Sequence, residues 1–322
     1  MTAGFDTRCR AFLADLLART TASGIDYALI HGAGDLADAL QSDLDIAIGE
    51  PPPRRWDGIL ATTAAAHGFL LCHCLHYEVP HGYYYILAVP GSPGQFLHLD
   101  CLFDPAGLAR YRTPTRFLLA GAESVDGQRR TRVDRMACYL LIKRARKGQT
   151  DAVRLAELRT LLATHGPAAS RHVEALTGLD ADPVIRAITD RPGEAAAALA
   201  TLRSELARRQ GGPARRLRVA LLTARRQLGR FLRPTGCFVV VVGPDGCGKS
   251  TVTAELLAQL ARGFRQTARF HWRPGLLPKL GRTNPGGDAG PAAPPRGESR
   301  YRGPVSLARF AYYAADFVLG YW

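Results

Sequence analysis

The sequence predicts an α/β fold in three stretches. These are a mixed-sheet α/β domain over residues 1–120, a basic helical region over 121–234 and the opening part of a parallel-sheet domain over 235–322. Two observations carry this prediction. Before residue 105, short runs alternate apolar and polar side chains with the period of half-buried strands. From residue 237 an apolar run, a glycine-rich loop and a helical pattern follow one another, as in a strand–loop–helix unit.

The first domain is expected to mix helices and strands in one sheet. Apolar spacing predicts helices over 5–22 and 59–68, and strands over 27–30, 43–48, 69–77, 83–89 and 95–103. From 126 to 232 the spacing is helical, with interruptions expected at 166–167 and 211–213. Residues 233–236 form the expected boundary. Residues 282–304 are rich in Gly, Pro, Ala and Arg, so we expect a flexible loop there.

The net charge of +14 is unevenly distributed. It is −4 over residues 1–120, +12 over 121–234 and +6 over 235–322, with arginine densest over 203–233. Such a basic helix suits a peripheral membrane or other anionic contact, or it lies solvated between domains. Nucleic acid is not expected as a partner, because no aromatic residue interleaves with these arginines before Phe231. The oligomeric state is left open.

The cysteines and the ends of the chain favour a cytoplasmic protein. Seven cysteines are scattered without a pairing pattern, and the first residues show no signal-peptide pattern. Residues 305–322 are apolar but contain Arg309 and Asp316. We therefore expect a buried or half-buried helix there, not a membrane span.

One glycine-rich loop has the spacing GxxxxGK[ST] and predicts nucleotide binding. It runs Gly243-Pro244-Asp245-Gly246-Cys247-Gly248-Lys249-Ser250-Thr251, between the apolar run 237–242 and a helical pattern over 253–260. In such a loop, backbone amides converge on phosphate oxygens. Lys249 reaches the β and γ phosphates, and the Ser250 hydroxyl ligates Mg²⁺. The expected ligands are therefore ATP and Mg²⁺, bound by Gly243 and the segment from Asp245 to Thr251.

This loop resembles that of thymidylate kinases, which carry an Asp two residues after the first Gly. The resemblance implies that Asp245 faces the acceptor and that Lys249 and Asp245 are catalytic residues. A strand over 269–275 falls where that family holds the acceptor phosphate, but Trp272-Arg273 replaces its Arg-Glu pair. The implied reaction is transfer of the ATP γ-phosphoryl group to a nucleoside monophosphate or a related acceptor.

The resemblance to a kinase covers only the opening of that fold. Residues after 237 offer two strands and one further helix over 307–319, without the later strands or the arginine-rich lid of the family. We therefore expect an incomplete P-loop sheet in a truncated chain. Such a chain would bind nucleotide weakly without transferring phosphate.

A second candidate site lies in the first domain. Asp43 and Asp45 are two residues apart on one expected strand, so both face one side of it. With Asp100 on a neighbouring strand, they have the chemistry to hold Mg²⁺ against a triphosphate. The alternative is a strand whose aspartates face solvent.

This pattern resembles nucleotidyltransferases of the DNA polymerase β type. The resemblance covers about residues 20–105 and implies that Asp43, Asp45 and Asp100 are metal ligands, with Gly32 in a phosphate-binding turn. Ala33 departs from the Ser or Gly of that family, which removes a hydroxyl that contacts phosphate.

Together, the two resemblances point to kinase-like proteins of bacterial surface polysaccharide synthesis. A nucleotide and an unidentified phosphate acceptor are the expected partners. The alternatives to a kinase are a metal-dependent nucleotidyltransferase and a non-catalytic, ATP-dependent scaffold or switch.

Overall fold

The structure is a computed structural model of the chain, which divides into two compact units, Met1–Thr235 and Gly236–Trp322. It describes residues 3–30, 43–49, 53–76, 81–105, 107, 113–125, 127–209, 212–232, 236–244, 246–261, 263–264, 267–269, 277 and 304–321. Each unit is described by itself.

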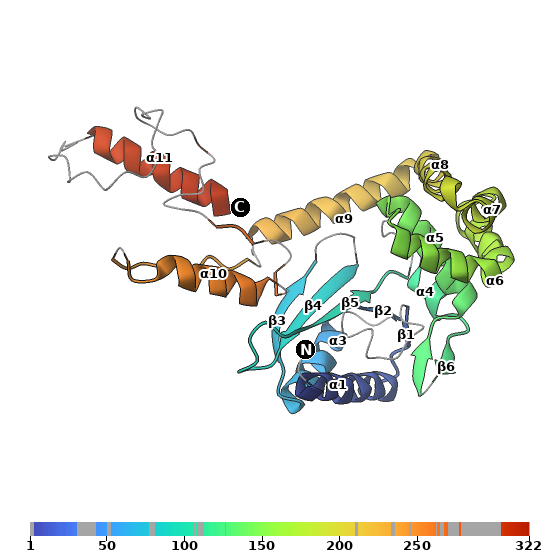
Figure 1. Cartoon of the computed structure of the whole chain (residues 1–322), viewed down its shortest axis with the longest axis horizontal. Helices are drawn as coiled ribbons and strands as arrows, with labels where there is room; N and C mark the ends of the chain where they lie inside the picture. The colour runs from blue at the N-terminus through green and yellow to red at the C-terminus, as the bar shows by residue number, and fades with distance from the viewer. Residues whose placement is uncertain are drawn as a thin grey trace. The chain divides into compact units, whose positions relative to one another are not determined.

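The first unit is an α/β domain built on a mixed seven-stranded sheet with the order β3-β4-β5-β2-β1-β7-β6 (Figure 1). Its strands are β1 (Tyr27–Leu29), β2 (Leu44–Ile48), β3 (Leu70–Leu75), β4 (Gly82–Ala88), β5 (Phe96–Leu102), β6 (Glu123–Val125) and β7 (Gln128–Arg130). The pairs β2–β5 and β1–β7 are parallel, and the remaining pairs are antiparallel. The expected strands of the first domain are thus confirmed.

Two groups of helices cover the two faces of this sheet. Helices α1 (Ala3–Ala22) and α3 (Pro53–Ala66) share one apolar core with alternate residues of β1, β2, β4 and β5. The other core is formed by α4 (Thr115–Leu119), α5 (Val133–Lys147), α6 (Ala152–Thr177), α7 (Asp182–Asp190) and α8 (Ala195–Arg208). A short 3-10 turn, η1 (Pro192–Glu194), joins α7 to α8.

Strand alternation decides which side chains face which helices. On β2, Leu44, Ile46 and Ile48 lie in the core with α1 and α3, whereas Ala47 lies in the core with α5. Because successive side chains point to opposite faces, Asp45 shares the α5 face with Ala47. The same reasoning places Asp100 of β5 on that face.

Two expectations for residues 126–232 were wrong. Strand β7 lies where helix was expected and pairs antiparallel with β6, with Val125 opposite Gln128. The sequence Asp126-Gly127 between them is a strong hairpin signal. Helix α6 also continues through Pro167, where an interruption was expected. Gly166 packs tightly on Ile185 of α7, since an added Cβ would lie 2.9 Å from Ile185 Cγ2. Packing of α6 on α7 therefore outweighs the local preference of proline.

Helix α9 (Pro213–Leu232) follows α8 at the end of the first unit. None of the α9 side chains that the structure describes is buried. Helix α9 also makes no extensive contact with another described helix or strand.

The second unit has two described helices, α10 (Lys249–Leu260) and α11 (Pro304–Tyr321). The expected strand over 237–242 is not formed: residues 236–244 pair with no described strand, and Val240 and Val242 are exposed. A strand needs a hydrogen-bonded neighbour, and the described part of this unit supplies none. Helix α11 confirms the expected helix, with Leu307 and Phe310 exposed, Tyr312 and Tyr313 half-buried and Asp316 buried. Most of the expected strand over 269–275 and the whole loop 282–304 lie outside the described residues.

All seven cysteines are free thiols. Within the part of the chain that the structure describes, no helix combines the length and apolarity needed to cross a membrane.

Candidate functional site

The three aspartates expected at the front site lie on one face of the sheet. Strands β2 and β5 are parallel neighbours, and Asp45 pairs in register with Asp100. Asp43 immediately precedes β2 and is two residues from Asp45, so it points to the same side. The structure therefore brings together the carboxylates that the sequence separates by more than fifty residues.

Helix α5 supplies a cation to this cluster. Lys143 Nζ lies 3.0 Å from Asp45 Oδ2, and the two side chains are only 16% and 12% exposed. Burial alone would lower the pKa of Lys143. The attraction of Asp45, Tyr139 and Asp100 outweighs burial and raises this pKa well above its ordinary value. Lys143 is therefore charged at neutral pH and balances the charge of Asp45.

Asp100 has a strongly shifted pKa. Burial and the nearby charge of Asp45, with a smaller contribution from Asp43, raise the pKa of Asp100 to about 7, although Lys143 opposes the shift. Like charges disfavour ionisation of a third carboxylate next to two others. The Asp100 carboxyl can therefore hold or release a proton near neutral pH.

Asp43 stands at the exposed edge of the cluster. The Tyr84 hydroxyl of β4 donates a 2.7 Å hydrogen bond to Asp43 Oδ1, and His98 Nδ1 lies 3.4 Å from the same oxygen. Burial works against ionisation, but the contacts with His98 and Tyr84 outweigh it and hold the pKa of Asp43 below its ordinary value. Asp43 is thus ionised at neutral pH.

The cluster as arranged suits an internal lysine cation better than Mg²⁺. Within the described residues, no group of three or more His, Cys, Asp or Glu side chains is arranged to hold a metal ion. Lys143 engages Asp45, while Tyr84 and His98 engage Asp43. Metal binding by Asp43, Asp45 and Asp100 stays a prediction, and Gly32 and Ala33 lie outside the described residues.

Sequence reasoning missed Lys143, Tyr84 and His98 as members of this cluster. Lys143 follows the apolar run Tyr139-Leu140-Leu141-Ile142 of α5, all of which is buried. A lysine at the end of such a run is unusual, because lysine is rarely buried without a partner. The position of Lys143 directly after this apolar run could have indicated a buried lysine with an acidic partner.

The glycine-rich loop of the second unit leads directly into α10. Gly246 and Gly248 have φ values of 83° and 86°, a left-handed conformation that favours glycine. At Gly243 an added Cβ would lie 2.6 Å from Cys247 Sγ, so a side chain there would force the Cys247 thiol to move. Gly248 precedes the first residue of α10, and its carbonyl accepts the Val252 amide. The glycines thus turn the chain sharply into the N-terminus of a helix.

Lys249 folds back over this loop. Its amino group donates to the carbonyls of Gly243 and Pro244 at 2.7 and 2.6 Å. Ser250 and Thr251 lie in the first turn of α10 and are exposed, as is Cys247. A lysine, a hydroxyl and a positive helix end therefore stand within one turn of chain. Asp245 lies outside the described residues.

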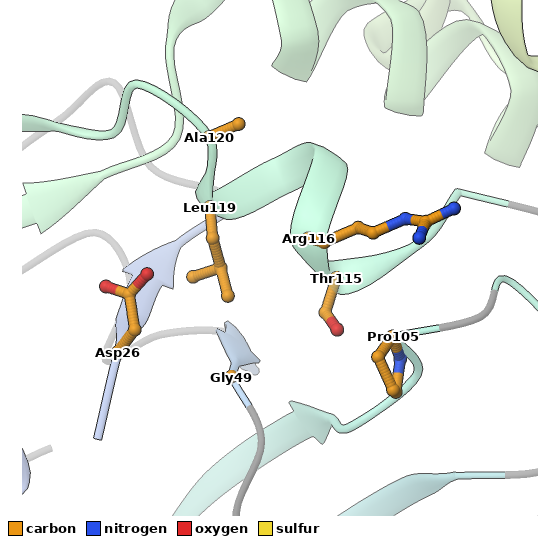
Figure 2. A pocket seen from close by; sticks show the side chains of 7 residues that line it. All are labelled: Asp26, Gly49, Pro105, Thr115, Arg116, Leu119 and Ala120. Carbon is orange, nitrogen blue, oxygen red and sulfur yellow. The ribbon is translucent and has the colours of Figure 1, made fainter. Parts of the chain in front are cut away.

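A separate hollow of about 490 Å³ opens at the other end of β2 from Asp43 and Asp45. Figure 2 shows its lining of Asp26, Gly49, Pro105, Thr115, Arg116, Leu119 and Ala120. The Arg116 guanidinium points away from the other labelled side chains (Figure 2). Asp26 is already paired with Arg129 at 2.8 Å. The lining therefore offers little charge to orient a ligand.

Comparisons with known proteins give little further guidance. No protein-family model and no curated protein matches this chain. Two chains of solved structures match, and one is the crystal structure of JHP933 from Helicobacter pylori. That match has 13% sequence identity and a TM-score of 0.32, and it covers 72% of this chain and 99% of JHP933. At that TM-score the likeness carries no argument about fold or function.

Proposed function

We propose that this chain is an ATP-binding protein of the kinase type that uses the loop Gly243–Thr251. One observation carries the proposal. The positive φ of Gly246 and Gly248 aims the loop at the first turn of α10, with the Lys249 amino group held over the same loop. Backbone amides at such a turn are donors suited to phosphate oxygens. The P-loop pattern in the sequence supports the same reading.

In this proposal, each polar group of the loop has one task. The Lys249 amino group exchanges its carbonyl partners for β and γ phosphate oxygens. The exposed Ser250 hydroxyl suits a magnesium ion that accompanies the nucleotide. Asp245 orients an acceptor such as a nucleoside monophosphate, to which the γ-phosphoryl group of ATP would pass.

The test is calorimetric titration of Mg·ATP into the full chain. Lys249→Ala should abolish measurable binding, because the lysine is the only side-chain cation within the loop sequence. Glu255→Ala is the matched control, since Glu255 is exposed on the same helix but lies beyond its first turn. Equal binding by the wild-type chain and Lys249→Ala would overturn the proposal.

A second candidate is nucleotidyl transfer at Asp43, Asp45 and Asp100. The in-register pair Asp45–Asp100 favours it, because two carboxylates then meet on one face. This activity would release pyrophosphate from ATP, whereas a kinase releases ADP. Loss of pyrophosphate release in Asp45→Asn but not in Lys249→Ala would select this candidate.

A third candidate is an ATP-dependent scaffold or switch without turnover. The exposed valines before the loop favour it, because a kinase needs a firmly held P-loop. ADP formation by the purified chain, lost in Lys249→Ala, would exclude this candidate.

A further inference from the structure

Helix α9 carries an apolar stripe along its whole length. Leu217, Leu221, Leu228 and Leu232 are spaced by four, seven and four residues, so they fall on one face at about 100° per residue. These leucines are 58–68% exposed. Because no described α9 side chain is buried, packing within the first unit does not account for this stripe.

Arginines flank the stripe. Helix α9 contains six arginines and no acidic residue: Arg215, Arg216, Arg218, Arg225, Arg226 and Arg230. Helical spacing places Arg218 and Arg225 on one side of the leucines and Arg216 on the other, and all three are exposed. Long arginine side chains in this position can lay their stems along an apolar surface while the guanidinium reaches polar groups.

A basic helix with an exposed apolar stripe gains little stability when only water surrounds it. Isolated helices of this length are marginal, and most helices gain stability by packing their apolar face. A surface that covers α9 must therefore offer both apolar groups for the leucines and a high density of negative charge for the arginines.

We propose that α9 lies in the surface of an anionic phospholipid bilayer, with its leucines in the acyl region and its arginines at the phosphates. This goes beyond the proposed nucleotide site and does not depend on it. A strongly basic helix with one apolar face and low overall hydrophobicity is the pattern of interfacial membrane helices. Arginines throughout α9 keep it from spanning the membrane.

Charge argues against the other parts of this protein as the surface that covers α9. A second copy of α9 would bring six more arginines against the first six. The second unit is also basic, with a net charge of +6 from residue 235 onward. A nucleic acid would satisfy the arginines but would leave the leucines without apolar partners.

The test is flotation of the full chain with vesicles of phosphatidylcholine, alone or mixed with phosphatidylglycerol. We expect binding to the mixed vesicles only, weakened by salt. Each of Arg216→Gln, Arg218→Gln and Arg225→Gln should lower the partition coefficient about fivefold. Leu221→Gln and Leu228→Gln should each lower it about tenfold.

Two exposed residues on other helices serve as matched controls. Arg186→Gln on α7 and Val153→Gln on α6 should leave vesicle binding unchanged. Every variant keeps the exposed apolar residues of the second unit. A loss of vesicle binding that is confined to the α9 variants therefore shows that α9, and not those residues, contacts the membrane. Circular dichroism checks that each variant keeps its helix content.

A tryptophan placed in the stripe gives a second readout. Leu228→Trp should show a blue-shifted emission with anionic vesicles, whereas Val153→Trp should not. The proposal is overturned if wild-type chain does not float with anionic vesicles, or if it binds neutral vesicles equally well. It is also overturned if Leu228→Gln abolishes a dimer or a nucleic-acid complex while leaving flotation unchanged.

Discussion

The carboxylate cluster and the glycine-rich loop are two phosphate-chemistry candidates built in opposite ways. The cluster draws Asp45 from β2, Asp100 from β5 and Lys143 from α5, and the pair Asp45–Lys143 is largely buried. The loop lies within nine consecutive residues, and its described members are exposed or half-buried. One site depends on the packing of a sheet against a helix, and the other depends on local backbone conformation.

This difference predicts how substitutions at each site affect the protein. Buried charges must balance one another, because removing one partner leaves the other charge uncompensated in a site that water does not reach. The loop uses backbone amides and glycine conformations, which do not depend on a distant charge. Changes in the cluster should therefore affect folding first, whereas changes in the loop should affect ligand binding first.

The largest expected effect comes from removing the cation of the cluster. Lys143→Met leaves Asp45, which is 9% exposed, without its partner and beside Asp100. Loss of one member of such a pair costs about 3–5 kcal/mol. Urea unfolding of the first unit, followed by far-ultraviolet circular dichroism, measures this change.

A double variant tests whether charge balance is the cause. In Lys143→Met with Asp45→Asn the buried charge is gone, so most of the lost stability should return. If the double variant is as unstable as Lys143→Met alone, lost packing rather than unbalanced charge explains the effect.

The sequence predicted the strands of this cluster but not its charge balance. Alternation identified β2 and β5, and i, i+2 spacing put Asp43 and Asp45 on one face. Lys143 is 98 residues from Asp45, and no local pattern states which helix covers that face. Contacts between distant elements follow from packing, so spacing alone does not reveal them.

The loop shows the reverse case. Its glycines, Lys249 and Ser250 could be assigned from consecutive residues, because the motif encodes the turn itself. The strand expected before it is absent from the described residues 236–244, since strand formation requires a neighbour. Local chemistry was thus predictable, and its non-local support was not.

The next effect is a pH dependence centred on Asp100. Its pKa is raised to about 7 from 3.8, so the folded state binds this proton more tightly than the unfolded state. Stability from this group is therefore complete below about pH 4 and is lost as pH rises to about 7. Asp100→Asn should remove this slope and be roughly 4 kcal/mol more stable than wild type at pH 8, since each pKa unit corresponds to about 1.4 kcal/mol.

The same variant provides its own control. At pH 4 the wild-type carboxyl is protonated, so Asp100→Asn and wild type should unfold at similar urea concentrations. A stability gain of Asp100→Asn over wild type that is as large at pH 4 as at pH 8 would contradict the raised pKa.

A smaller and more local effect is expected from Gly248→Ala. A side chain at φ 86° costs about 1–2 kcal/mol. Because the strain falls in the loop, affinity for Mg·ATP should drop about tenfold while the urea unfolding of the first unit stays unchanged. Gly229→Ala in α9 is the matched substitution, since an added Cβ there meets nothing within 4 Å. Equal ATP affinity in Gly248→Ala and wild type would show that this loop does not bind the nucleotide.

The smallest effect lies at the exposed edge of the cluster. Tyr84→Phe removes the 2.7 Å hydrogen bond to Asp43. Water can replace this bond, because half of the Asp43 side chain is exposed, so the stability loss should be at most about 1 kcal/mol. The pKa of Asp43 should rise toward its ordinary value, because the hydroxyl favours the charged carboxylate. Carbon-detected NMR titration of the Asp43 carboxylate measures this rise.

Tyr85→Phe on the same strand separates the two readouts. Its hydroxyl donates to Asp57 at 2.6 Å, on the opposite face of β4 from Tyr84. This variant should lose as much stability as Tyr84→Phe or more, because Tyr85 is fully buried, yet leave the pKa of Asp43 unchanged. A shift of the Asp43 pKa in both variants would mean that the strand itself moves. A shift in Tyr84→Phe alone would show that, even at its exposed edge, this cluster is tuned by single contacts between distant strands.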